Sequence, residues 1–251
     1  MVEISIITAV LNGEKTLSDC LTCISQQKDI KVQHIIVDGG STDYSLTIVN
    51  HYPHIQTVVI KDKISLYEAL NMGIKRANGE VIGMLHCDDI FTSRHTLNTV
   101  IQCFKDQSID AVYGDLVVVE RGNKSKVIRR WKAGEFRYDS LRLGWMPPHP
   151  TLFIRKSIFQ KYGLYKTNFS ISSDYELIVR FLYCHKISIK YLRYPLVIMR
   201  NGGLSNQTIK NRWLANKEDL KAWKLNNLPC PTLLRIFKPL RKLSQFYPSL
   251  F

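Results

Sequence analysis

The chain has 251 residues, of which 45% are hydrophobic and 22% charged, with a formal net charge of +14. This balance is typical of a globular domain, and the absence of any apolar run of roughly 20 residues excludes a membrane-spanning helix. Six cysteines are scattered without a repeated pair spacing, and the sequence begins with strand-like residues and no signal peptide. We therefore expect a cytoplasmic protein with reduced thiols.

The first half of the chain alternates short apolar stretches with helical patterns. The apolar stretches are rich in β-branched residues, as buried parallel strands are. Strands and helices in alternation favour an α/β fold with a mostly parallel sheet and helices on both faces. We expect strands at residues 3–10, 33–37, 55–60, 81–85 and 111–115, and helices at residues 16–27, 65–77 and 92–104, with a further helix from Tyr44.

Acidic residues follow several of these strands. Asp38, the adjacent pair Asp88 and Asp89, and Asp115 each stand at an expected strand end. Because the carboxyl ends of parallel strands share one edge of a sheet, we expect these acids to converge. Two adjacent carboxylates repel each other, so the pair is interpreted as holding a divalent metal against a nucleotide diphosphate. The alternatives are a helix start for the pair and a capping loop for Asp38.

Two Ser-x-x-Glu patterns predict capping boxes at helix starts. They give Glu68 and Glu176 structural roles, since each would bond back to the backbone of its serine, Ser65 or Ser173. Asp174 lies in the first turn of the second of these helices and is not needed by its box. It is therefore the acid left over for chemistry.

The second half of the chain departs from the alternating pattern. We expect a hairpin over residues 117–131, a strand at 151–154, a helix at 155–162, a helix from Ser172, and two strands at 187–192 and 196–199. Two helical patterns follow residue 206, where nine lysines and arginines and two acids give a net charge of +7. This basic, amphipathic end either docks on an anionic membrane surface or packs on the domain.

Several function classes fit the sequence poorly. The first strand is followed by Asn12-Gly13 alone, without the Gly-x-Gly-x-x-Gly turn of a dinucleotide enzyme. The charge of +14 raises the question of nucleic acid, but clustered strand-end acids would repel phosphates, so we expect no nucleic-acid partner.

Taken in order and spacing, these segments resemble family 2 glycosyltransferases. The resemblance covers about residues 3–205, and its strength lies in the joint order of the motifs. The matching segments are Ile-Ile-Thr-Ala-Val-Leu-Asn (6–12), Ile-Val-Asp-Gly-Gly-Ser-Thr-Asp (36–43), Leu-Tyr-Glu-Ala-Leu-Asn-Met-Gly (66–73), Gly-Glu-Val-Ile-Gly-Met-Leu-His-Cys-Asp-Asp (79–89), Val-Tyr-Gly-Asp (112–115), His-Pro-Thr-Leu-Phe-Ile-Arg (149–155), Ser-Asp-Tyr-Glu-Leu-Ile-Val-Arg (173–180) and Gly-Gly-Leu-Ser (202–205).

The resemblance implies a GT-A fold, which is Rossmann-like, with a role for each part of the chain. Residues 1–115 would form the nucleotide-sugar-binding half, and residues 116–205 the acceptor-binding half of the same domain. Residues 206–251 would be a basic amphipathic helical tail. It also implies an inverting enzyme that uses a nucleotide-sugar donor and a saccharide or lipid-linked saccharide acceptor, of the cell-surface polysaccharide type.

The resemblance also implies roles for individual residues. In the family, the residues matching Thr8 and Asp38 meet the nucleotide base. The residue matching Asp88 meets the ribose and can share the metal, and the residue matching Asp89 binds Mg²⁺ or Mn²⁺ across the diphosphate. The acid matching Asp174 is the general base.

Asn12 and Asn71 lie in matching segments, and we expect both to help bind the nucleotide-sugar donor. The sequence departs from the family at His86, where many members carry an aspartate, and at Ser173, where many carry a glutamate. Arg200 and the Gly202-Gly203 loop are candidates for closing over the diphosphate, with a plain turn as the favoured alternative.

The chemistry agrees with this interpretation. A metal across two phosphates neutralises the charge of a leaving diphosphate, and one carboxylate that deprotonates the acceptor contributes typically 10²- to 10⁴-fold. The alternative is a sugar-phosphate nucleotidyltransferase with a related sheet. That class needs a glycine-rich basic loop after its first strand, and Leu11-Asn12-Gly13-Glu14 is not such a loop.

Overall fold

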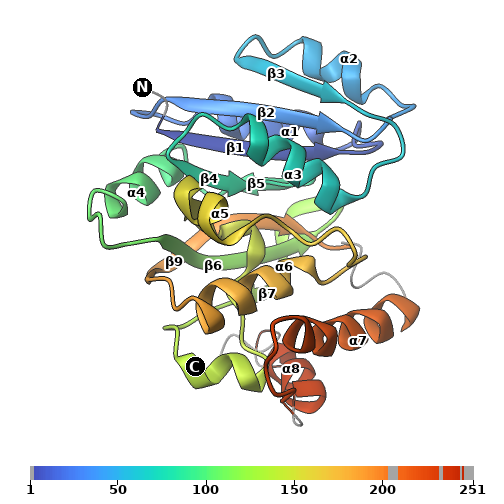
Figure 1. The fold of residues 1–251 in the computed structure, drawn as a ribbon. Coiled ribbons are helices and arrows are strands. Elements are labelled where there is room, and N and C mark those ends of the chain that lie inside the picture. Colours follow the sequence, from blue (N-terminus) through green and yellow to red (C-terminus); the bar gives the residue numbers. More distant parts are fainter. Residues whose placement is uncertain (1–2, 203–208, 232–233, 244, 246–251) are drawn as a thin grey trace.

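The computed structural model describes residues 3–202, 209–231, 234–243 and 245 of the chain. These residues form one curled sheet with helices on both faces (Figure 1). The prediction of an α/β fold with a mostly parallel sheet is confirmed, since six of the nine strands of this described part point the same way.

The first half of the sheet is wholly parallel. Its strands lie in the order β3-β2-β1-β4, and Val10 of β1 pairs with Asp38 of β2. The strands are β1 (Ile4–Val10), β2 (Val32–Asp38), β3 (Ile55–Ile60) and β4 (Val81–Met84). β1 is buried on both faces, which is why its sequence is apolar and β-branched with little alternation. The ends of these strands therefore open onto one edge.

The second half of the sheet is mixed, in the order β8-β6-β9-β5, with β7 paired to β6. Its strands are β5 (Asp89–Phe91), β6 (Ala111–Glu120), β7 (Asn123–Trp131), β8 (Phe153–Arg155) and β9 (Ile189–Arg200). The prediction of two strands at 187–192 and 196–199 is wrong, because β9 continues past Pro195 through a register shift opposite Asp115. β6 likewise continues beyond Asp115, so Asp115 does not end a strand.

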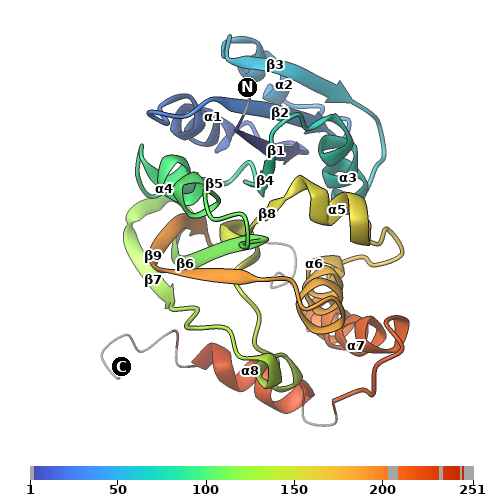
Figure 2. The ribbon, with the colours of Figure 1, turned by 60° about the vertical axis from the view of Figure 1, so that its left-hand side comes forward.

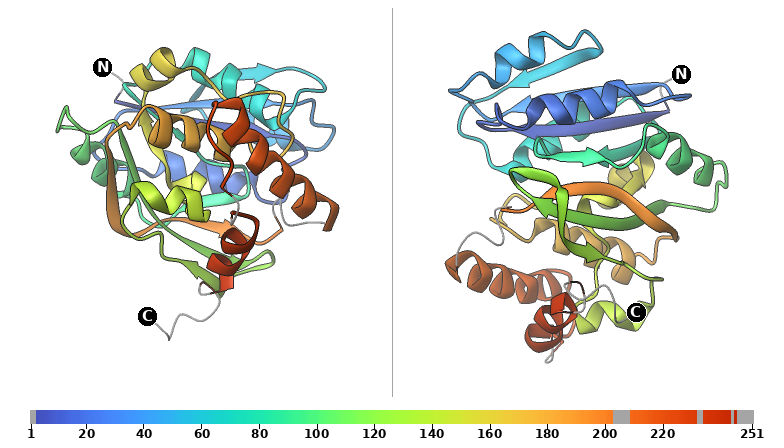
Figure 3. Two further views of the ribbon diagram at one scale, coloured as in Figure 1. Left: turned by 60° about the horizontal axis from the view of Figure 1, so that its bottom comes forward. Right: turned by 180° about the vertical axis from the view of Figure 1, so that it is seen from behind.

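The helices cover both faces (Figures 1 and 3). α1, α2 and α4 lie on one face, and α3, α5 and α6 on the other. The capping box of α3 is confirmed, with both bonds between Ser65 and Glu68 present. The bounds are α1 (Leu17–Ser25), α2 (Ser45–Asn50), α3 (Leu66–Arg76), α4 (Thr96–Cys103), α5 (Lys156–Tyr162) and α6 (Ser173–Ile178), which a π-helical turn extends to Cys184. Short 3-10 turns occupy Tyr138–Leu143 and His149–Thr151.

Of the last two helices, α7 (Ile209–Leu225) lies beside α6, and α8 (Leu234–Leu243) lies beside the 3-10 turn at Tyr138–Leu143 (Figures 1 and 2). Trp223 is fully buried there, whereas Trp213 is 65% exposed. The Glu218 carboxylate accepts three backbone N–H bonds from residues 170–172, just before α6. α7 therefore packs on the domain along one side, while residues 206–208, 232–233, 244 and 246–251 of the expected basic tail fall outside the described residues. Within the described part, no helix combines the length and apolar character needed to cross a bilayer.

Gly79, which leads into β4, generates a prediction about stability. A Cβ at this position would lie 2.6 Å from the backbone of Ile4 and Ser5 in β1, where no side chain can move aside. We expect Gly79→Ala to lower the free energy of unfolding by about 1–3 kcal/mol, measured by urea denaturation. Gly122→Ala is the matched control, because a Cβ there has no neighbour within 4 Å. Equal stability of the two variants would contradict the close approach.

Candidate functional site

The loops after β1 and β2 are joined by hydrogen bonds at the shared edge of the sheet. Asn12, which has a left-handed backbone with φ of 51°, accepts from the Thr42 N–H at 2.9 Å, and its own N–H donates to the Ser41 hydroxyl at 2.9 Å. The buried Asp38 carboxylate accepts from the Gly40 and Ser41 N–H groups and from the Ser41 hydroxyl. These hydrogen bonds tie the loop at Asn12 to the loop at Gly40–Thr42, and the two loops together form a ledge at the edge of the sheet.

Two residues assigned to the donor have partners inside the protein. The Thr8 side chain is buried, and its hydroxyl lies 3.1 Å from His34 Nε2. Burial lowers the pKa of His34 to about 3, so this imidazole is neutral. The Asn71 amide makes two hydrogen bonds to the backbone of Tyr165 and fixes that loop. A nucleotide contact at Thr8 or Asn71 stays a prediction, since both side chains already bond to groups of the protein.

Asp88 and Asp89 follow β4, as the sequence indicated for the strand end. Both carboxylate oxygens of Asp89 are buried and have no hydrogen-bond partner. Burial, and then the charge of Asp88, raise the pKa of Asp89 well above its ordinary value. Asp88 is half-buried. A buried carboxylate without donors is costly unless a cation approaches it.

Arg200 contacts the turn that carries this pair. Its side chain is buried, donates from Nη1 to the Asp88 carbonyl at 2.8 Å, and forms an ion pair with Asp19. Its charge also lowers the pKa of Asp89. Arg200 therefore holds the turn that carries the two acids, and a contact of Arg200 with a diphosphate stays a prediction.

His86 interacts electrostatically with Asp88 of the acid pair and with Asp174. Its ring centroid lies 6.1 Å from that of His149, and the charges of both Asp88 and Asp174 raise its pKa. Burial and the neighbouring His149 outweigh them and bring the pKa of His86 to about 4. Burial likewise lowers the pKa of His149 to about 4. A neutral imidazole thus lies within electrostatic reach of both acidic positions.

Asp174 lies in the first turn of α6, half-buried among hydroxyl groups. Its Oδ1 accepts from the Tyr175 N–H at 2.8 Å and lies 3.5 Å from the Tyr67 hydroxyl. Tyr67 stacks on Tyr165, whose hydroxyl lies 2.7 Å from His149 Nε2. Burial raises the pKa of Asp174, against the pull of Lys238, of the Tyr175 N–H and of His86. A carboxylate placed in this way is suited to taking a proton at neutral pH.

Two sequence-based expectations at this site are wrong. Ser173 and Glu176 form no capping box: Ser173 donates to the Lys166 carbonyl, and the buried Glu176 carboxylate forms a bidentate pair with Arg180. The reason is that an arginine four residues further along the helix offers two donors, where the backbone offers one. Asp115 does not join the other acids, because the Ala133 N–H and the Tyr191 hydroxyl occupy its carboxylate inside the sheet.

Sequence reasoning missed three residues that interact with Asp174. Tyr67 lies in a segment that matches the family, yet its place as an aromatic neighbour of Asp174 depends on a contact 107 positions away. Tyr165 carried no signal at all. Lys238, from α8, also acts on Asp174, and nothing in its local sequence separates it from the other lysines of the basic tail.

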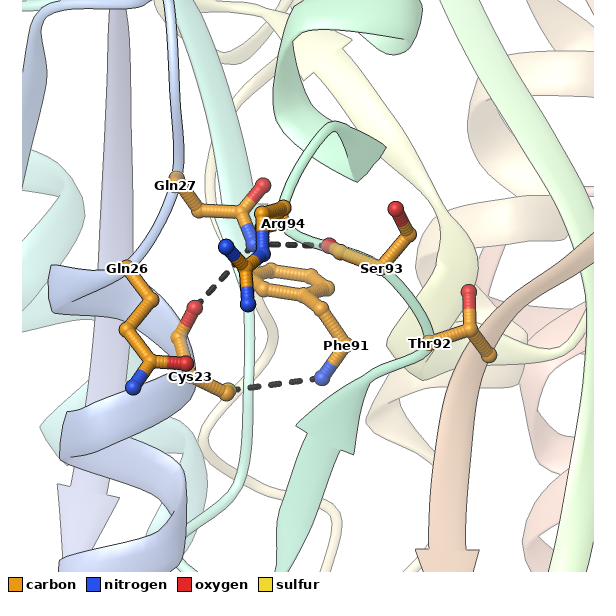
Figure 4. Close-up of a pocket in the computed structure, with 7 residues that line it drawn as sticks. All are labelled: Cys23, Gln26, Gln27, Phe91, Thr92, Ser93 and Arg94. Carbon is orange, nitrogen blue, oxygen red and sulfur yellow. Dashed lines mark hydrogen bonds between the residues drawn. The ribbon is translucent and has the colours of Figure 1, made fainter.

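A separate pocket of about 330 Å³ opens between the end of α1 and the segment after β5 (Figure 4). The Phe91 N–H donates to Cys23 Sγ at 3.4 Å, and Gln27 bridges Cys23 and Ser93 through its side-chain amide. None of the acids assigned above lines this pocket. It is therefore distinct from the site at the strand ends.

Comparison with solved structures identifies the class. The fold matches *S. aureus* TarS 1-349 in complex with UDP-GlcNAc with a TM-score of 0.69, at 16% identity over 89% of this chain and 65% of that chain. It also matches the mannosyltransferase PcManGT from Pyrobaculum calidifontis in complex with GDP-Man and Mn2+, with a TM-score of 0.63 and 18% identity over 95% and 68% of the two chains. The chain spans 39% of a longer TarS structure. The fold is that of the GT-A glycosyltransferases.

The sequence comparisons identify the family. The model of glycosyl transferase family 2 matches residues 5–163, and the chain belongs to that family. A PGL/p-HBAD biosynthesis glycosyltransferase of Mycobacterium bovis is 29% identical over 219 residues, which are 84% of this chain and 82% of that protein. Glycosyltransferase GlyG of Streptococcus pneumoniae is 30% identical over 116 residues, 45% and 38% of the two chains.

The role of Arg200 generates a prediction. Arg200→Met would leave the Asp88 carbonyl and the Asp89 charge without their cationic neighbour, so we expect a loss of about 1–3 kcal/mol in the free energy of unfolding. Arg193→Met on the same strand is the control, because the Arg193–Glu135 pair is 79% and 58% exposed and should contribute about 0–1 kcal/mol. Chemical denaturation measures both. A loss no greater at Arg200 than at Arg193 would remove this supporting role.

Proposed function

We propose that this chain transfers a sugar from a nucleotide-diphosphate donor to a hydroxyl acceptor with inversion at the anomeric carbon, in a metal-dependent reaction with one general base. The observation that carries the proposal is a chain of ring contacts that starts at His86, two residues before Asp88. His86 packs on His149, and the rings of Tyr165 and Tyr67 continue from there to Asp174. A donor held at the acid pair would thus present its sugar toward Asp174. Family membership supports glycosyl transfer as the reaction.

The acid pair suits a divalent cation. Asp89 offers two carboxylate oxygens without partners, and Asp88 lies beside it. Among the described residues no cluster of three or more His, Cys, Asp or Glu forms a complete protein-only metal site. Mg²⁺ and Mn²⁺ suit such a site, since Mg²⁺ is commonly held by one or two carboxylates together with substrate phosphates. When bound, the ion would neutralise charge on the leaving diphosphate.

Asp38 and the ledge formed with Asn12 would receive the nucleotide. The Asp38 oxygens already hold the loop in place, so the ledge is preformed and would cost little ordering on binding. A TarS structure in complex with UDP-GlcNAc and a PcManGT structure in complex with GDP-Man share this fold, which supports a nucleotide-sugar donor here. Asp88 would meet the ribose, and Thr8 and Asn71 would shape the donor site from behind.

Asp174 would remove the proton of the acceptor hydroxyl as that hydroxyl attacks. One displacement with one base inverts the anomeric centre, whereas retention needs a second carboxylate as nucleophile. Two other acids near this helix already have cationic partners: Glu176 is paired with Arg180, and Asp219 with Lys238. This supports inversion over a double displacement.

The acceptor would be a saccharide, or a lipid-linked saccharide of a growing polysaccharide, reached from the cytoplasmic face of a membrane. Trp213 is 65% exposed, Leu240 50% and Phe237 36%, and Lys217 lies 5.5 Å above the Trp213 ring. Exposed aromatic and aliphatic side chains among lysines suit an anionic lipid surface, where each Lys or Arg contributes about 1 kcal/mol. Through these side chains, the tail formed by residues 206–251 would bind the protein peripherally to the membrane surface.

Substitution of the two acids tests the proposal. We expect Asp89→Ala and Asp174→Asn both to abolish turnover with an active sugar nucleotide, found by screening a panel for metal-dependent hydrolysis without acceptor. Only Asp89→Ala should weaken binding of the donor, because it removes a metal ligand, whereas Asp174 acts on the acceptor. Calorimetric titration of the donor with Mn²⁺ separates the two effects. Near-normal turnover by Asp174→Asn would show that Asp174 is not the base.

Vesicle flotation tests the membrane surface. The full chain should float with anionic vesicles, and the double variant Trp213→Ser with Leu240→Ser should float markedly less, because apolar area and charge act together in interfacial binding. Tyr44→Ser is the control, since Tyr44 is 72% exposed beside α2 in the nucleotide-binding half. Equal flotation of all three proteins would remove the membrane proposal.

A further inference from the structure

The C-terminal helix α8 brings a lysine to the neighbourhood of Asp174. Lys238 Nζ lies 2.7 Å from Asp219 Oδ2 of α7 and 3.9 Å from the centroid of the Tyr175 ring. The two charged side chains are 17% and 3% exposed. Tyr175 follows Asp174 directly in α6, so a nearly buried ion pair sits against the turn that carries the proposed base.

The position of Lys238 is fixed by packing around it. Gly144 has a φ of +76°, and a Cβ there would lie 2.5 Å from the Lys238 Cβ, so the backbone of α8 rests on this glycine. Leu234, at the start of α8, is 1% exposed. On the α7 side, the Trp223 ring N–H donates to the Tyr175 hydroxyl at 3.0 Å. Three helices therefore hold the lysine where it is.

Stability alone does not explain this ion pair. Taking a lysine and an aspartate out of water costs about as much as their attraction returns, and apolar replacements are often neutral or stabilising. The pair is also incompletely bonded, because Asp219 Oδ1 is buried without a partner. A nearly buried ion pair against the turn that carries Asp174 therefore indicates a role in the electrostatics of that carboxylate.

The groups that face Asp174 come from several elements. Lys238 of α8 lowers the pKa of Asp174, and so do the Tyr175 N–H and His86 from the loop after β4. Asp219 of α7 interacts with Asp174 as a like charge. Tyr67 of α3 and Tyr165 before α6 are neutral hydroxyl groups whose own pKa values are raised by burial. In this described set, Lys238 alone carries a full positive charge, since burial keeps His86 neutral at pH 7.

We infer that Lys238 is a positioning residue for the transfer reaction, whose ammonium group keeps Asp174 deprotonated and makes the C-terminal helix part of the active site. The inference rests on the proposed function, because it assumes that Asp174 is the base. Its sign is defined: removing the positive charge raises the pKa of Asp174, and removing the negative charge of Asp219 lowers it.

The pH dependence of kcat and KM tests this inference on the full chain. In Lys238→Met, which keeps the length of the side chain, the acid limb of the profile should move to higher pH by about one unit. At pH values below the acid limbs of both proteins, the rate of Lys238→Met should then be about tenfold lower than that of the wild type. The plateau rate should stay within about twofold of the wild-type value. Asp219→Asn should move the limb to lower pH, and Lys238→Arg should keep the wild-type limb. Lys224→Met, at an exposed position of α7, is the control.

The outcomes separate this inference from the function on which it rests. Opposite displacements of the acid limb in Lys238→Met and Asp219→Asn, with KM for the donor unchanged, support it. Superimposable profiles, or an equal fall at every pH, overturn it and leave Lys238 a structural residue. If Lys238→Met fails to fold, the direction of the limb in Asp219→Asn decides. Absence of any transfer by the wild-type chain would count against the proposed function itself.

Discussion

Parallel pairing of β1 with both β2 and β4 is the constraint on which the site depends. It aligns Val10 with Asp38 and Ile7 with Met84, so two loops and the acid pair leave the sheet at one edge. The antiparallel strand β8 then joins β4 to the second half of the sheet, where α6 carries Asp174. The acid pair and Asp174 are thus positioned by elements of one continuous sheet.

The edge concentrates acids in surroundings that oppose their charge. Burial raises the pKa of both Asp89 and Asp174, and different groups stabilise the charged form of each carboxylate. Arg200 lowers the pKa of Asp89, and a bound metal ion would lower it further. Lys238 and the Tyr175 N–H lower the pKa of Asp174. His86, whose ring lies against His149, is neutral at pH 7 and so adds no charge to the electrostatic field of these acids.

Local sequence predicted the elements well and the contacts between them poorly. The strands up to β4 and the capping box at Ser65 follow from apolar runs and short-range bonding, which are read directly from sequence. β5 was missed because three residues give no period, and the Glu176 box was wrong because Arg180 competes through a side-chain pair. The surroundings of Asp174 include Tyr67 and Lys238, which are far from it along the chain. No local sequence pattern could therefore predict these two interactions.

The central claim is that a metal-bound donor lies beside His86, on the path from the acid pair to Asp174. Paramagnetic broadening of histidine ring resonances by Mn²⁺ with a nucleoside diphosphate tests it most directly. The account predicts strong broadening of His86 and His149, none of His51 at the end of α2, and loss of the effect in Asp89→Ala. Broadening that spares His86, or that persists unchanged in Asp89→Ala, would contradict it.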